Sequence, residues 1–149
     1  MFSLEGVFGT DSTQKFVFDT LVQPMVLDAM KGYNMTLFTF GQTGSGKTFT
    51  MSGIIGSPCD KGIISRTAET LYSFDKCKVK LSCMEIYQEK LFDLLIPSSG
   101  RDHRLKSHGQ IRIRQQKSGE VWVQGLTERE PGINELLAHV IITISCTEY

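Results

Sequence analysis

The sequence of 149 residues has few cysteines and prolines and no net charge. The four cysteines, at positions 59, 77, 83 and 146, form no C-x-x-C pair. This excludes a disulfide framework and indicates reduced thiols in the cytosol. The 16 Lys and Arg residues balance 16 Asp and Glu residues, so the overall charge indicates neither nucleic-acid nor membrane binding.

Long hydrophobic runs and targeting signals are also absent. No apolar run reaches the length of a membrane span, and the first residues lack the basic region and apolar core of a signal sequence. We therefore expect a cytoplasmic protein. His103 and His108, even with Asp102 nearby, do not have the spacing of a common metal site, which favours solvated loop residues. Composition is otherwise that of one soluble domain or part of one.

The most informative stretch is Gly-Gln-Thr-Gly-Ser-Gly-Lys-Thr at residues 41–48, which fits the P-loop pattern G-x-x-x-x-G-K-[ST]. Its glycines allow a tight turn, so that backbone N–H groups surround phosphate oxygens. Lys47 adds a positive charge near the β- and γ-phosphates, and the Thr48 hydroxyl ligates Mg²⁺. The predicted nucleotide-binding residues are therefore Gly41, Gln42, Thr43, Gly44, Ser45, Gly46, Lys47 and Thr48.

The sequence around this loop supports the assignment. Residues 35–40 are apolar and β-prone, which predicts a strand. The residues that follow, Phe49 to Met51, are suited to a short helix that begins near Lys47. Strand, glycine loop and helix form the usual setting of a P-loop, and this disfavours the alternative of a glycine-rich turn without a ligand.

Hydrophobic periodicity predicts the remaining elements, and their alternation indicates the α/β class. We expect a short strand over 2–8, followed by a helix that begins with a capping box at Asp11 and Gln14, is kinked at Pro24 and ends at Lys31–Gly32. A helix over 63–72, a strand over 78–87 and a helical piece over 89–95 come next. The last predicted elements are a hairpin of 111–114 and 121–123 and a helix over 134–140. The β-prone run 140–144 has nothing after it to pair with.

Residues 101–117 contain six Lys or Arg residues and one Asp, which is the only strong charge run. Alternation in the predicted hairpin places Arg112 and Arg114 on one face, with Lys117 in the turn. A solvated surface is one interpretation and an electrostatic docking site is the other. Trp122 is predicted to be a packing residue and not a ligand platform.

The chain resembles the kinesin motor domain family over about residues 2 to 138. The resemblance is carried by Gly32-Tyr33-Asn34, by the loop with Gln42 and Thr43, which P-loop mechanics do not require, and by three downstream segments. These are Gly62-Ile63-Ile64-Ser65-Arg66, the run Glu85-Ile86-Tyr87-Gln88-Glu89 with Asp93-Leu94-Leu95, and residues 119–127, which resemble the family's hairpin ending in V-x-G-L-T.

The resemblance implies a P-loop NTPase-type three-layer α/β/α fold with a central, mostly parallel sheet and an accessory β-hairpin. It implies ATP or ADP with Mg²⁺ as ligands and microtubule-based movement, hence a cytoplasmic, cytoskeletal location. Phe49 lies where the family often stacks a ring on adenine, and core packing is the alternative. The hairpin with Arg112, Arg114 and Lys117 resembles a segment that touches tubulin, which is acidic and suits the basic run.

Several family segments do not occur in these residues. They are the Arg-x-Arg-Pro strand that borders adenine, and the N-x-x-S-S-R-S-H and D-L-A-G-S-E switch segments that orient water and sense the γ-phosphate. We therefore expect a truncated motor domain at 1–138, a divergent tail at 139–149 from a mistaken reading frame or intron, and little hydrolysis by the chain alone. The alternatives are a non-catalytic module that binds nucleotide or tubulin, and an unrelated P-loop enzyme such as a small nucleotide kinase. Direction of movement, cargo and oligomeric state are not predicted.

Overall fold

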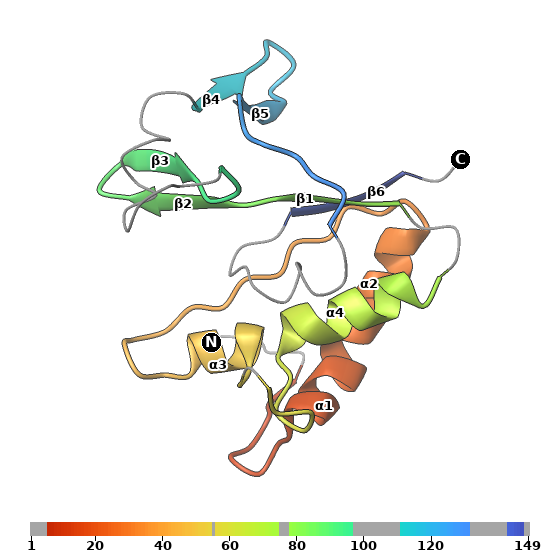
Figure 1. Ribbon diagram of the computed structural model, residues 1–149. Coiled ribbons are helices and arrows are strands. Elements are labelled where there is room, and N and C mark those ends of the chain that lie inside the picture. The colour runs from red at the N-terminus through yellow and green to blue at the C-terminus, as the bar shows by residue number, and fades with distance from the viewer. Residues whose placement is uncertain (1–5, 55, 75–77, 97–110, 132–142, 148–149) are drawn as a thin grey trace. The chain divides into compact units, whose positions relative to one another are not determined.

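Helices occupy the first half of the chain and strands occupy the second (Figure 1). This computed structural model describes residues 6–54, 56–74, 78–96, 111–131 and, for the backbone alone, 143–147. The chain divides into two compact units, Met1–Cys77 with Cys146–Tyr149 and Lys78–Ser145. Within the described ranges, every helix is too short or too polar to cross a membrane.

The first unit begins with a helical run of three parts: α1 (Gln14–Val17), the π-helical turn η1 (Phe18–Val22) and α2 (Gln23–Met30). Thr13 is the N-cap of this run, and its side-chain oxygen accepts a hydrogen bond from the Phe16 N–H at 3.1 Å. The predicted capping box at Asp11 and Gln14 is therefore wrong. Thr13 stands three residues before Phe16, which is the spacing that an N-cap side chain needs.

Pro24 lies in the first turn of α2, directly after the π-helical turn η1, and the kink predicted there stays a prediction. Proline has no N–H to donate to a carbonyl four residues earlier. Just before it, the Gln23 N–H bonds the Phe18 carbonyl, five residues back. The run ends as predicted at Lys31–Gly32, because Gly32 has a φ of 94° and its N–H bonds the Ala29 carbonyl at 3.0 Å. Glycine takes this left-handed conformation without the clash of a Cβ.

The core of the first unit lies between this run and α4 (Ile63–Tyr72), which contacts both η1 and α2. The buried residues of the run recur every four positions, so they form one apolar face. They are Phe18, Val22 and Val26, and α4 contributes Ile63, Ile64, Ala68 and Leu71. The predicted helix over 63–72 is confirmed.

The predicted strand before the glycine loop is wrong, because residues 35–40 form no strand. Phe38 is 75% exposed and Phe40 is 86% exposed, and the centroids of their rings lie 6.1 Å apart. A strand requires neighbours that supply ladder hydrogen bonds, and among the described residues no strand pair or bridge includes residues 35–40. The expected strand over 2–8 is also not seen at Gly6 to Phe8, and its first residues lie outside the described ranges.

The strands of the described residues form three two-stranded sheets (Figure 1). The strand predicted over 78–87 is present but divided at Cys83, into β1 (Lys78–Ser82) and β2 (Met84–Tyr87). Buried Val79 and Leu81 alternate with exposed lysines in β1. β1 pairs with β6 (Thr143–Thr147), so part of the C-terminal β-prone run has an earlier strand as its partner.

The helical piece predicted over 89–95 is wrong. Residues Lys90–Asp93 form strand β3, which pairs antiparallel with β2. Gln88 and Glu89 connect the two strands with φ values of 47° and 61°. A two-residue hairpin turn with two positive φ values matches the right-handed twist of the strands. Gln and Glu are not the residues that usually indicate such a turn, so the sequence pattern does not show it.

We expect Gln88→Asn to stabilise the chain by about 0.5 kcal/mol, because Asn adopts the left-handed conformation at lower cost than Gln. Urea denaturation measures the free energy of unfolding. Gln115→Asn is the matched control, since Gln115 lies on an exposed strand and the same change should not stabilise there. Equal effects of the two substitutions would contradict the proposed turn strain.

The predicted hairpin is confirmed as β4 (Arg112–Gln115) and β5 (Val121–Gln124). Gly119 has a φ of 89° in the connection, and its N–H bonds the Gln116 carbonyl at 3.0 Å. The helix predicted over 134–140 lies outside the described residues.

Candidate functional site

The glycine loop leads directly into a short helix, α3 (Lys47–Ser52), as the sequence predicts. Gly46 is the N-cap of this helix, with a φ of 89°, and its carbonyl accepts from the Thr50 N–H at 2.8 Å. Gly41 has a φ of 155°, and a Cβ there would lie 2.5 Å from the Ser45 Oγ. A side chain at either position would be strained, so the closed loop depends on these glycines.

Lys47 folds back over its own loop. Its Nζ donates hydrogen bonds to the carbonyl of Gly41 at 2.9 Å and to the carbonyl of Gln42 at 2.7 Å. An ammonium group has three donors, so these two bonds hold the positive charge over the loop and leave one donor for a ligand oxygen. A fixed cation beside a glycine-rich loop fits a phosphate group.

Thr48 and Phe49 follow Lys47 in the first turn of α3, and both are exposed. A threonine hydroxyl is a hard oxygen ligand of the kind that Mg²⁺ accepts beside phosphates. In the described ranges, no cluster of His, Cys, Asp and Glu could hold a metal ion, and His103 and His108 lie outside them. The Phe49 ring is 46% exposed, so it does not pack in the core of the first unit.

Sequence patterning did not identify Gln14 as part of this region. Its amide Nε2 donates to the Phe49 carbonyl at 2.5 Å, and the residue is only 8% exposed. A signal was present in the sequence, because Gln14 precedes Phe18, Val22 and Val26 at the same spacing of four. A polar residue on such a stripe is buried with the apolar ones and requires a partner.

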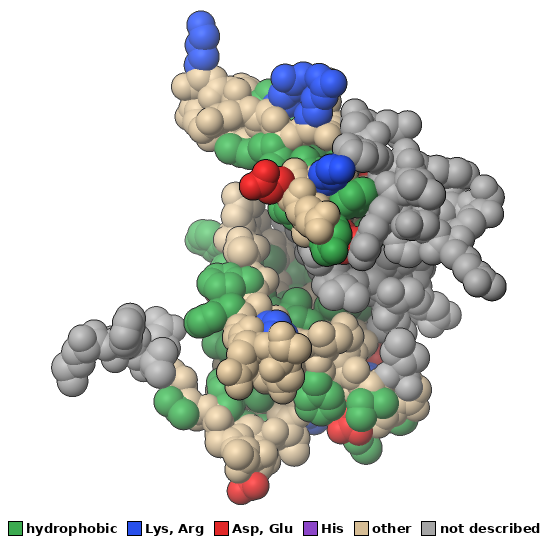
Figure 2. Space-filling model, turned by 90° about the vertical axis from the view of Figure 1, so that its left-hand side faces the viewer, with side chains coloured by type: hydrophobic (Ala, Val, Ile, Leu, Met, Phe, Trp, Pro, Cys, Tyr) green, Lys and Arg blue, Asp and Glu red, His purple; other side chains and the backbone are tan. Residues whose placement is uncertain are grey.

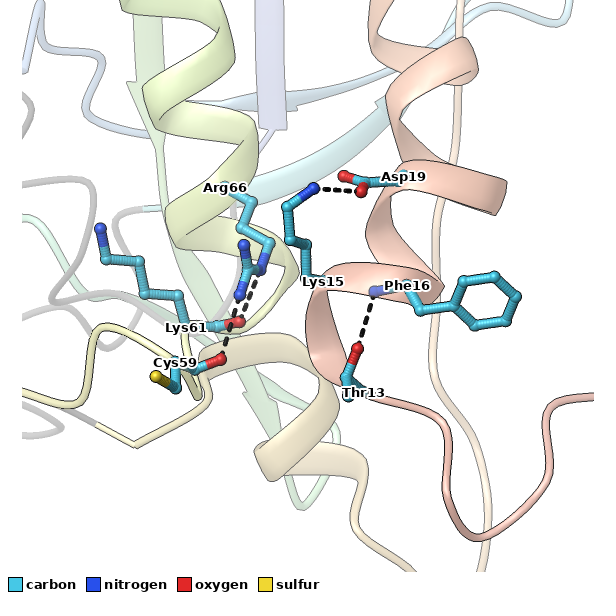
Figure 3. Close-up of polar contacts among 7 residues, drawn as sticks. All are labelled: Thr13, Lys15, Phe16, Asp19, Cys59, Lys61 and Arg66. Carbon is cyan, nitrogen blue, oxygen red and sulfur yellow. Dashed lines mark hydrogen bonds and ion pairs between the residues drawn. The ribbon is translucent and has the colours of Figure 1, made fainter.

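The far end of α3 is joined closely to α4. A Cβ on Gly62 would lie 2.4 Å from the Met51 carbonyl oxygen, and one on Gly53 would lie 2.0 Å from the Asp60 carbonyl oxygen. Arg66 of α4 donates to the carbonyls of Lys61 and Cys59 at 3.0 and 3.2 Å (Figure 3). Backbone contact and these bonds hold the loop between α3 and α4 in place.

A second candidate surface lies on the β4–β5 hairpin. Arg112 pairs with Gln124 and Arg114 pairs with Trp122, so these four side chains share one face, as predicted for the arginines. The Arg114 Nε donates to the Gln124 Oε1 at 2.8 Å. Trp122 is 42% exposed, so the prediction that it packs in a core is wrong. In Figure 2, blue Lys and Arg side chains lie near the top of the view, at the vertical level where Figure 1 labels β4 and β5.

Asp93, at the end of β3, does not offer its carboxylate to a metal. The residue is 1% exposed, and its oxygens accept from the Leu95 N–H at 2.9 Å and the Thr127 N–H at 2.7 Å. Both carboxylate oxygens therefore accept hydrogen bonds from backbone N–H groups of the second unit.

Comparison with known proteins gives one consistent result. The kinesin motor domain family matches residues 1–145. The chain is 39% identical over 137 residues to kinesin-related protein 3 of Dictyostelium discoideum, which covers 85% of this chain and 11% of that protein. It is 43% identical over 135 residues to the kinesin heavy chain of Syncephalastrum racemosum, and this alignment covers 85% of this chain and 14% of that protein.

A solved structure of a fast kinesin, described in connection with ATPase mechanism and microtubule interactions, is similar with a TM-score of 0.75 and 32% identity. The alignment covers 91% of this chain and 38% of that one. This likeness confirms the predicted P-loop NTPase-type α/β fold class. The chain spans 14% or less of the length of the two curated relatives named above.

Proposed function

Because the chain belongs to the kinesin motor domain family, we propose that it binds Mg-ATP and Mg-ADP through its P-loop as part of a microtubule motor. The observation that carries this proposal is Lys47, whose ammonium is held by two loop carbonyls at the start of α3. A positive charge already fixed beside the glycine loop loses little freedom when a phosphate binds.

In this proposal each residue of the loop has a role. Loop N–H groups contact the phosphates, apart from that of Ser45, which donates to the Gln42 carbonyl at 3.2 Å. Lys47 neutralises the terminal phosphate oxygens, and Thr48 provides a hydroxyl to Mg²⁺. The exposed ring of Phe49 contacts adenine. When bound, the nucleotide supplies the phosphoanhydride bond that a motor hydrolyses.

We propose little hydrolysis by these 149 residues alone. Phosphoryl transfer requires a positioned water and stabilisation of the equatorial oxygens, in addition to a cradle for phosphates. The sequence holds the cradle but neither switch segment. In this proposal residues 1–138 are the motor-like part and 139–149 are a divergent tail.

Calorimetric titration of Mg-ATP and Mg-ADP into the full 149-residue chain tests the binding. We expect saturable binding of one nucleotide, accompanied by an increase in thermal stability because the ligand binds the folded state alone. A folded chain that gives neither heat nor a thermal shift would falsify the proposal.

The partner that we propose is tubulin, contacted through Arg112, Arg114 and Lys117 on the β4–β5 hairpin, which implies a cytoplasmic, microtubule-associated location. The two arginines lie on one exposed face, where positive charge attracts an acidic surface. The same surface supports the second candidate function, a non-catalytic module that binds nucleotide or tubulin. Measurable steady-state hydrolysis with microtubules present would distinguish a motor from such a module.

Reversing both charges, as Arg112→Glu with Arg114→Glu, is expected to weaken microtubule co-sedimentation by about tenfold or more, since attraction becomes repulsion. The difference should shrink at high salt because exposed charges are screened. Lys15→Glu with Lys31→Glu is the matched control, because it changes the net charge equally at two exposed positions, one in α1 and one at the C-cap of α2. Equal losses in both double variants would exclude the hairpin as the contact.

A further inference from the structure

The buried amide of Gln14 has a specific partner in the nucleotide site. Its side chain continues the buried stripe of Phe18, Val22 and Val26, yet it ends in a polar group. That group donates to the carbonyl of Phe49. The only residue of α1 that is buried therefore contacts the helix that follows the P-loop.

The Phe49 carbonyl is held from two sides. It accepts the Gly53 N–H at 2.8 Å, which is the ordinary helical bond, and the Gln14 amide at 2.5 Å from outside the helix. A carbonyl oxygen has two lone pairs, so both are used. The backbone of Phe49 is fixed at this point while its ring remains 46% exposed.

The bond from Gln14 also closes a connection among three helices. α1 continues through η1 and α2, which pack on α4. α4 in turn meets the end of α3 through the contact of Gly62 with the Met51 carbonyl. Gln14 adds a link from α1 to the middle of α3, so this helix of six residues is held at two points.

Phe49 and Lys47 point to different sides of α3, because residues two positions apart on a helix differ by roughly 200° in direction. A change in the backbone at Phe49 should therefore alter contact with a base more than contact with phosphates.

We propose that Gln14 is a positioning residue, which fixes the backbone of Phe49 so that its exposed ring meets the nucleobase. This inference rests on the proposed nucleotide binding. It predicts that Gln14 affects ligands that carry a base and has little effect on ligands that carry phosphates alone.

The test compares Mg-ADP with magnesium tripolyphosphate, which has phosphate charge but no base, by calorimetry on the full chain. Gln14→Met should weaken Mg-ADP binding by about fivefold, as expected for one lost hydrogen bond. Tripolyphosphate affinity should change by less than about twofold. Lys15→Met, on the next residue of α1 and exposed, should change neither affinity.

A double-mutant cycle on Mg-ADP affinity distinguishes positioning of Phe49 from a purely structural role of Gln14. If Gln14 acts through Phe49, then Gln14→Met in a Phe49→Ala background should cause no further loss of Mg-ADP affinity, because interacting residues are not additive. Gln14→Leu, which is also apolar and lacks the amide donor, replaces Gln14→Met if the latter does not unfold cooperatively.

The two ideas fail in different ways. If neither Mg-ADP nor magnesium tripolyphosphate binds, or if Lys47→Ala binds both ligands as tightly as the unmodified chain does, the proposed nucleotide binding is wrong. If binding depends on Lys47 but Gln14 variants weaken both ligands equally, leave both unchanged, or act additively with Phe49→Ala, the positioning role alone is overturned.

Discussion

Replacing Lys47 with alanine is expected to weaken Mg-ATP and Mg-ADP binding by about 10- to 100-fold. A hydrogen bond to a charged group contributes about 1.5–3 kcal/mol, and about 1.4 kcal/mol corresponds to a factor of ten. The substitution removes the charge and also the two bonds that join Nζ to the carbonyls of Gly41 and Gln42. Isothermal titration calorimetry on the full chain measures the loss.

Two further variants separate charge from loop closure. Lys47→Arg keeps the positive charge but changes the geometry at the two carbonyls, so an intermediate loss indicates that the closed loop contributes beyond charge. Lys31→Ala is the matched control, because it removes an exposed lysine that pairs with Asp28 on α2, and it should leave affinity unchanged. If Lys47→Ala binds within about twofold of the unmodified chain, Lys47 does not hold the phosphates.

Replacing Asp93 with alanine is expected to lower the free energy of unfolding by about 3 kcal/mol. The substitution leaves the backbone N–H groups of Leu95 and Thr127 without their present acceptor, and each such loss costs about 1–3 kcal/mol when the group is buried. The carboxylate joins the end of β3 to a residue 34 positions later, so its removal also loosens a non-local connection in the second unit.

Urea denaturation followed by tryptophan fluorescence suits this test, because Trp122 is the single tryptophan and lies in the same unit as Asp93. Asp93→Asn keeps the shape and one acceptor oxygen, so it should cost less than alanine. Asp28→Ala, at an exposed ion pair on α2, should cost about 1 kcal/mol or less. A loss below about 1 kcal/mol for Asp93→Ala would show that the two N–H groups find other partners.

The two carboxylate oxygens of Asp93 are both used within the second unit. They accept hydrogen bonds from the backbone N–H groups of Leu95 and Thr127. In the proposed site, Mg²⁺ is expected to depend on Thr48 and on the phosphates of the nucleotide, a ligand set that suits a cation which keeps most of its water.

The sequence alone determined the local features of this protein. The glycine loop, the helix that begins at Lys47, the stop at Gly32, the helix over 63–72 and the β4–β5 hairpin follow from residues close together in the chain. Glycine at positive φ, proline without an N–H and regular apolar spacing act within a few residues. The same locality made the family resemblance readable from short motifs.

Tertiary structure decided the features that depend on partners distant in sequence. Residues 35–40 have the composition of a strand, but no strand in the described part of the chain pairs with them. The turn at Gln88 and Glu89 exists because β2 and β3 pair across it. Gln14 meets Phe49 across 35 positions and Asp93 meets Thr127 across 34. A buried polar group is satisfied by whichever partner packing brings near, and periodicity does not specify that partner.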